Sequence, residues 1–110
     1  MGYYTDFRLI ASDVEVLKKV WQEEIEGTEF GDMDFDGTEC SYWAKWYDHN
    51  EDLINVSKKY PDVLFTLYGK GESSGDIWRK YYKNGKYQVA KAFISYEEFD
   101  EAKLKEYVAC

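Results

Sequence analysis

The acids of Asp32-Met33-Asp34-Phe35-Asp36-Gly37 are the residues of this chain whose spacing most resembles a chemical site. Carboxylates at positions one, three and five and a glycine at position six open a calcium-binding loop of the EF-hand type. Such a loop closes with a bidentate Glu at position twelve, where this chain has Trp43. We therefore expect no metal site, and we interpret the aspartates as the solvent side of a hairpin strand whose Met33 and Phe35 point inward. Weak calcium binding is the alternative.

This motif lies within a longer acidic stretch, from Glu23 to Glu39, that contains no Lys or Arg. Like charges at this density repel one another, so selection for stability alone would intersperse lysines. One interpretation is a face that binds a basic partner protein in imitation of nucleic-acid phosphates; the other is a solvated face that keeps the chain soluble. The residues assigned to the partner-binding face are Glu23, Glu26, Glu29, Asp32, Asp34, Asp36 and Glu39.

Groups suited to catalysis are few in this sequence. The one histidine, His49, stands among acids at a predicted helix start, where we expect it to make local hydrogen bonds. A Ser/His/Asp or Cys/His mechanism needs a nucleophile beside that ring, and no local motif supplies one. Cys40 and Cys110 lack neighbours at zinc-ligand spacing and do not form a disulfide framework. We therefore expect a protein that is not an enzyme and needs no cofactor.

Two other segments have features of ligand-binding regions. Residues Gly69 to Gly75 loosely resemble a phosphate-binding loop, but such a loop contains Gly-Lys-Ser/Thr and precedes a helix, whereas a strand is expected here. A small ligand or nucleotide held by this loop is the alternative function. The stretch from Lys70 to Lys91 combines basic and aromatic residues, as in proteins that stack bases. A net charge of −8, with 22 acids against 14 bases, nevertheless disfavours a nucleic-acid partner.

Three tryptophans are candidate aromatic anchors for a partner protein: Trp43, Trp46 and Trp78. Trp43 and Trp46 fall on opposite faces of a regular strand, so one of them lies away from a helix-covered core. An exposed Trp near a Tyr is typical of a protein interface. Burial under a C-terminal helix is the other interpretation.

Hydrophobic periodicity predicts the elements that must position these residues. Residues 3–10 alternate as a strand, and Ser12 and Glu15 have the capping-box spacing that starts a helix over 12–26. Asp36-Gly37 and Asn84-Gly85 predict tight hairpin turns. The remaining elements expected are a hairpin over 28–47, a helix from Asp48 or Asn50 to Pro61, strands over 63–68, 76–82 and 86–94, and a last helix from Ser95.

The predicted fold class is α+β: a ferredoxin-like β-α-β-β-α-β sandwich with an extra C-terminal hairpin strand and helix, as one domain over residues 1–110. No stretch approaches the ~20 apolar residues of a membrane span, and no secretory signal is visible at the N-terminus. We therefore expect a cytoplasmic protein, monomeric or homodimeric, with no membrane partner.

Several segments together resemble the YubB ferredoxin-like domain family, over roughly residues 38–90. They are Trp43-Ala44-Lys45-Trp46, Lys58-Lys59-Tyr60-Pro61-Asp62, the strand through Phe65, Gly75-Asp76-Ile77-Trp78 and Asn84-Gly85-Lys86. The chain departs from the family where Tyr47-Asp48-His49 replaces a Pro-rich turn. The resemblance implies the fold and an origin in phages, plasmids or other mobile elements, and it carries over no catalytic residues. Together with the acidic stretch, it leads to the hypothesis of an accessory protein that binds a basic host protein in the host cytoplasm, as an inhibitor of a defence system.

Overall fold

The computed structural model describes residues 3–24 and 33–107 of the chain. Its strands are β1 (Thr5–Ala11), β2 (Asp34–Phe35), β3 (Cys40–Ala44), β4 (Phe65–Gly71), β5 (Ile77–Lys83) and β6 (Lys86–Lys91). Its helices are α1 (Val14–Lys19), which continues into the π-helical segment η1 (Val20–Glu24), then α2 (His49–Lys59) and the short 3-10 helix η3 (Glu101–Lys103).

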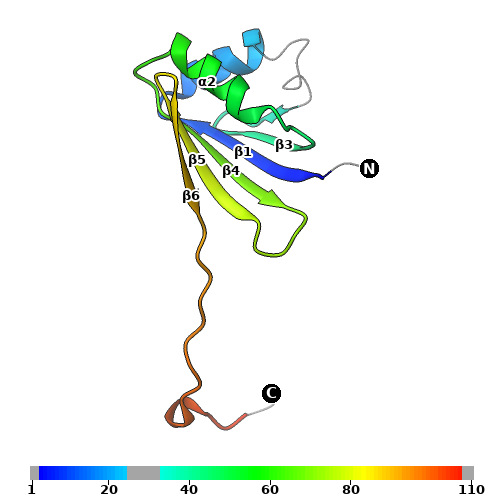
Figure 1. Cartoon of the computed structure of the whole chain (residues 1–110), viewed down its shortest axis with the longest axis vertical. Coiled ribbons are helices and arrows are strands. Elements are labelled where there is room, and N and C mark those ends of the chain that lie inside the picture. Colours follow the sequence, from blue (N-terminus) through cyan, green and yellow to red (C-terminus); the bar gives the residue numbers. More distant parts are fainter. Residues whose placement is uncertain (1–2, 25–32, 108–110) are drawn as a thin grey trace.

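The described strands form one antiparallel sheet in the order β2-β3-β1-β4-β5-β6, so the fold is α+β (Figure 1). Strand β1 lies inside the sheet, where Phe7 stands opposite Tyr42 of β3 and Gly69 of β4. Helices α1 and α2 lie over the same face of the sheet (Figure 1). The opposite face, which carries no helix within residues 3–24 and 33–107, is called the open face below.

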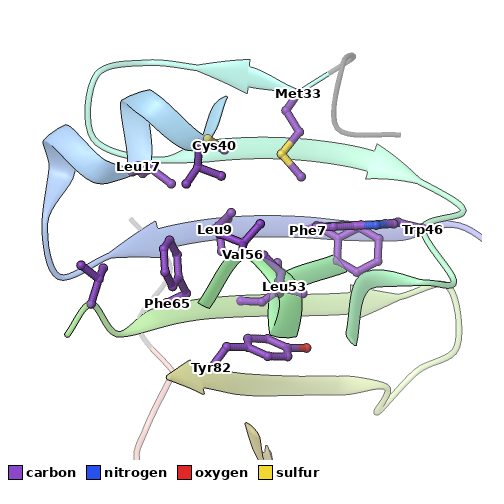
Figure 2. Packing of buried hydrophobic residues seen from close by; sticks show 13 residues of the cluster. Phe7, Leu9, Leu17, Met33, Cys40, Trp46, Leu53, Val56, Phe65 and Tyr82 are labelled. Atoms are coloured by element: carbon purple, nitrogen blue, oxygen red, sulfur yellow. The ribbon is translucent and has the colours of Figure 1, made fainter. Parts of the chain in front are cut away.

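The core fills the space between the sheet and the two helices (Figure 2). Side chains along β1 alternate as a half-buried strand requires, with Phe7 and Leu9 buried while Asp6 and Arg8 are exposed on the open face. The largest fully buried side chains include Trp46, Tyr82, Phe65, Leu9, Leu17, Leu53 and Leu67. Both helices and three neighbouring strands therefore contribute to one hydrophobic cluster.

The first helix begins one residue later than the capping-box spacing predicts. Asp13 is the N-cap, and its carboxylate accepts hydrogen bonds from the backbone N–H groups of Glu15 and Val16. Ser12 instead joins the helix start to the sheet, because its N–H donates to the Leu64 carbonyl and its hydroxyl accepts from the Leu64 N–H. The predicted cap was therefore wrong, although the helix was right.

The predicted Asn84-Gly85 turn is confirmed. The hairpin at Asp36-Gly37 forms, but its turn is not the predicted one: Asp36 has no positive φ and its N–H donates to the Glu39 carbonyl at 3.2 Å, so the chain reverses at Gly37 and Thr38. Gly37 has a φ of +101°, and Asn84 and Gly85 have φ values of 49° and 76°, which is the left-handed region that such turns require. The N–H of Gly85 also donates to the Ser57 hydroxyl at 2.8 Å, which attaches the β5–β6 hairpin to α2. Turn chemistry thus sets both the strand register and one contact between the sheet and a helix.

The end of the chain differs from the prediction in two ways. The strands expected over 76–82 and 86–94 both form, as β5 and β6, so the sheet has two strands beyond β4, whereas the predicted fold class has one extra strand. The helix expected from Ser95 does not form; residues 92–107 have no regular structure apart from η3, which is capped by the Asp100 carboxylate. A short helix needs a packed apolar face for stability, and every residue from Lys91 to Tyr107 is exposed.

The sheet core predicts different costs for two leucines near the start of β4. Leu67 is fully buried, so Leu67→Ala should lower the free energy of unfolding by about 2–5 kcal/mol through lost burial and a cavity. Leu64 is exposed, so Leu64→Ala should change it by less than about 1 kcal/mol. Urea unfolding of both variants measures this difference, and equal effects would contradict the assignment of the buried face.

Candidate functional site

The predicted acidic face is only partly described by the structure. Glu26, Glu29 and Asp32 lie outside the described residues, whereas Glu23, Asp34, Asp36 and Glu39 lie within them. Glu23 and Asp34 are exposed, and Asp34 stands on β2 opposite Ser41 of β3. The edge of the sheet at β2 therefore carries an available carboxylate.

Two of the described acids have structural partners. The Asp36 carboxylate accepts hydrogen bonds from the N–H groups of Thr38 and Glu39, and these bonds lower its pKa. On the open face, Nη2 of the Arg8 guanidinium donates to both carboxylate oxygens of Glu39, with N···O distances of 2.7 and 2.9 Å. Both carboxylates thus stabilise the hairpin and its neighbouring strand, and they are less available to a partner than Asp34.

The tryptophans separate into three environments. Trp46 is 1% exposed, and its indole N–H donates to the Asp52 carboxylate at 2.7 Å, so it is a core residue and not an exposed anchor. Trp78 is half-buried at the edge of the helix-covered face. Trp43 is 59% exposed on the open face, where its ring stacks on Tyr4 at a centroid separation of 5.6 Å. Within the C-terminal residues that the structure describes, 92–107, no helix covers Trp43.

Trp43 belongs to an exposed group that we call the aromatic corner: Tyr4, Trp43, Lys45 and Tyr47. The Lys45 ammonium lies over the Tyr4 ring at 5.0 Å, and the Tyr47 hydroxyl accepts a hydrogen bond from the Tyr3 N–H. These side chains line a shallow hollow of about 690 Å³ that also includes Asp34. The corner therefore joins a predicted anchor to a predicted acidic residue.

A second cluster was missed by the sequence analysis, which treated His49 only as part of a helix start. Its Nδ1 does make the expected local hydrogen bond, donating to the Trp46 carbonyl at 2.7 Å. The other nitrogen, Nε2, then accepts from the Lys80 ammonium at 2.8 Å, and the ring stacks on Trp78. We call His49, Trp78 and Lys80 the His49 cluster. Because His49 lies on α2 whereas Trp78 and Lys80 lie on β5, only the fold brings them together. The alternation that points Trp78, Lys80 and Tyr82 to one face was the available signal.

The His49 cluster holds its two ionisable groups partly away from water. Burial lowers the pKa of His49 below its ordinary value, and the Lys80 charge acts in the same direction, although the Trp46 carbonyl opposes them. Burial also lowers the pKa of the Lys80 ammonium. Lys80 opens onto a hollow of about 480 Å³ that also contains Asn50, Gly75 and Lys91. Two lysines and one acid, Asp76, line the hollow, so its ionisable groups have a net positive charge that can attract a small anionic group.

The loop predicted over 69–75 is shorter in the structure, because residues 69–71 belong to β4, and close packing explains two of its glycines. A side chain at Gly69 would overlap the Trp78 indole, and one at Gly71 would overlap Tyr3. The Tyr3 hydroxyl donates to the Asp76 carboxylate at 2.6 Å and accepts from the Ser73 N–H at 2.9 Å. This loop is therefore closed around a tyrosine hydroxyl, and only Gly75, at its end, lines the Lys80 hollow.

Cys40 is a buried free thiol whose pKa is raised to about 12 by burial, which makes it unreactive. Among the described residues, no three His, Cys, Asp or Glu side chains gather as a metal would require. Within the same residues, no helix has the length and apolar character to cross a bilayer.

Comparisons of the chain with protein-family models, with curated proteins and with solved structures found no match.

The His49 cluster predicts a pH dependence of stability. The unfolded imidazole takes up a proton near pH 6.5, whereas the folded one resists it; the folded state therefore loses stability as the pH falls below 6.5. Chemical denaturation from pH 6.5 down to about 5, above the main carboxylate range, should give a slope that approaches 1.4 kcal/mol per pH unit at most. Since this is the chain's one histidine, His49→Gln should flatten the slope; an unchanged slope would contradict the assignment.

Proposed function

We propose that this chain is a protein-binding module and not an enzyme, with a ferredoxin-like fold and an origin in a phage or another mobile element. The order β2-β3-β1-β4 among the first four strands, with α1 and α2 over one face, supports a ferredoxin-like sandwich extended by β5 and β6. The resemblance of residues 38–90 to the YubB family supports the origin.

The contact surface is the aromatic corner with Asp34. The observation that carries the proposal is Trp43, which is 59% exposed, stacked on Tyr4 and seated in a hollow beside a carboxylate. A rigid exposed Trp supplies a large apolar contact at little entropic cost, and such residues dominate the energetics of interfaces. Burying this ring against a partner removes the cost of leaving it in water.

The partner is a host protein with a basic surface, and binding it inhibits a host defence system. Asp34 is exposed on the edge strand β2 and Glu23 is exposed on η1, and such carboxylates attract and orient a basic surface. The acids of the 25–32 stretch extend the same charge along the sequence. Anchor and charge thus have separate tasks: Trp43 supplies affinity, and the acids supply encounter rate and specificity.

Affinity purification from the host, followed by measurement of the isolated complex, tests this function. Trp43→Ala should weaken binding by about 30-fold or more, as for an interface anchor. Asp34→Lys should slow association, with a smaller dependence on salt. Tyr87→Ala, which removes an exposed aromatic from β6 outside the aromatic corner, is the matched control and should leave affinity unchanged.

Unchanged thermal unfolding of Trp43→Ala shows that the variant is folded, since the ring is outside the core. If Trp43→Ala and Asp34→Lys both bind the partner as tightly as the wild type does, the aromatic corner is not the contact surface.

A small anionic ligand or nucleotide is a second candidate function, favoured by the Lys80 hollow with Gly75 at its rim. Millimolar nucleotides, cyclic ones included, should then raise the unfolding temperature, because a ligand at 100 times its Kd stabilises by about 2.7 kcal/mol. Lys80→Met should abolish the shift, whereas Lys83→Met, on the same strand but outside the hollow, should retain it. Absence of any shift in a nucleotide and phosphate screen would reject this candidate.

A further inference from the structure

The C-terminal residues 92–107, called the tail below, expose an unusual amount of apolar surface. Beyond β6 the chain runs away from the sheet and does not return to it (Figure 1). Its large apolar side chains are 61–96% exposed: Phe93, Ile94, Tyr96, Phe99, Leu104 and Tyr107. The radius of gyration of 18.4 Å accordingly exceeds the ~13 Å of a compact chain of this length. Apolar surface gathered in one segment is typical of an interaction site.

The open face of the sheet has a hollow that can receive such a segment. Residues of β1, β4, β5 and β6, together with Ala92 and Phe93 directly after β6, line a hollow of about 560 Å³ there, called the open-face hollow. Its floor includes Tyr68, with the Arg79 guanidinium 4.9 Å above the ring, and Tyr81. The hollow is thus apolar and aromatic at its base, and it is separate from the aromatic corner over β3.

The tail and the open-face hollow have opposite charges. The tail carries five acids, which are Glu97, Glu98, Asp100, Glu101 and Glu106, against two lysines. The hollow is lined by four basic residues, which are Arg8, Lys70, Arg79 and Lys91, and by one acid, Asp6. Arg8 is already paired with Glu39, so the three other cations exceed the one acid. Aromatic side chains flanked by acids therefore match a basic, aromatic surface in both chemistry and sign.

The first residues of the tail favour an extended chain that leads away from the sheet. Ala92-Phe93-Ile94-Ser95-Tyr96 contains no Gly, Pro or Asn, and its aromatic and branched residues favour extended chain over a reversal. The Ala92 N–H still donates to the Ile77 carbonyl, so the tail leaves as a continuation of β6. The first two tail residues, Ala92 and Phe93, lie at the border of their own open-face hollow, and the rest of the tail then runs away from the sheet and leaves the hollow uncovered.

We propose that the tail docks in the open-face hollow of a second copy of this chain, and that the exchange is reciprocal in a twofold-symmetric dimer. Exchange of identical segments is a low-cost route to dimers, because each copy offers both the segment and its receptor. An extended tail reaches up to ~50 Å, which is ample to cross a six-stranded sheet about 24 Å wide. The four aromatics of each tail, at ~150 Å² each, bring the buried area to about 1,200 Å², the lower range of specific interfaces.

Sedimentation velocity of the full chain over a dilution series tests the dimer first. The wild type should be dimeric at high concentration. Tyr96→Ser with Phe99→Ser, which changes only exposed tail residues, should weaken dimerisation at least about tenfold. A wild type that stays monomeric throughout would overturn the proposal, whether the tail is free, folded back on its own sheet or reserved for a different protein.

Charge reversal then tests the pairing of tail and hollow. Lys70→Glu with Arg79→Glu makes the hollow acidic, and Glu98→Lys with Glu101→Lys makes the tail basic; each double variant alone should dimerise about tenfold or more weakly than wild type. Mixed together, they should form a heterodimer, because each tail then meets a hollow of opposite charge.

Lys83→Glu with Lys86→Glu is the matched control, with the same charge change on β5 and β6 outside the hollow, and it should dimerise like wild type. If the mixture fails to associate, or if the control is weakened as much as the hollow variant, the docking site is wrong. Trp43→Ala should leave the dimer intact, so failure of this inference is distinguishable from failure of the aromatic corner as a partner site.

Discussion

The Phe7 ring packs against aromatic rings from three other parts of the described chain. It lies on β1 within 5.3 Å of the Trp46 and His49 rings and 6.1 Å of Trp78, counted between centroids. Those three residues come from the β3–α2 connection, the start of α2 and the strand β5. Packing around one phenylalanine therefore fixes where α2 sits over the sheet, and most of the architecture follows from that placement.

One consequence is that the sheet buries a single face. With α1 and α2 together on the Phe7 side, every second residue of the inner strands points to a surface that no helix covers within the described chain. That surface carries Trp43 and Tyr4 at one end and Tyr68 with Arg79 at the other. An uncovered antiparallel face with two aromatic regions supports two separate contacts, one for a partner protein and one for a second copy.

The same packing explains the partly desolvated pair on the covered side. Lys80 points toward the helices because it lies two residues before the buried Tyr82 on β5 and so shares its face of the sheet. It reaches His49 at the start of α2, which lies over this part of the sheet. The residues next to Lys80 in the sequence do not predict its contact with His49. The energetic cost of holding an ammonium there is offset by its hydrogen bond to the imidazole and by its position 4.6 Å from the Trp78 ring.

Local chemistry in the sequence determined the strands, the two main helices and both hairpins, because alternation, helical spacing and positive-φ residues act within a few neighbours. Strand alternation predicted that Trp43 and Trp46 face opposite ways, but Trp46 lies beyond the end of β3. Only tertiary packing decided that Trp46 is the buried one, because it packs beneath α2 and donates to Asp52. The Ser95 capping spacing predicted a helix that does not form, since no apolar surface packs on it. The partners of Asp36 lie within its own turn and were accessible to local reasoning, whereas the Arg8–Glu39 and His49–Lys80 contacts each join residues 31 positions apart and depend on the fold.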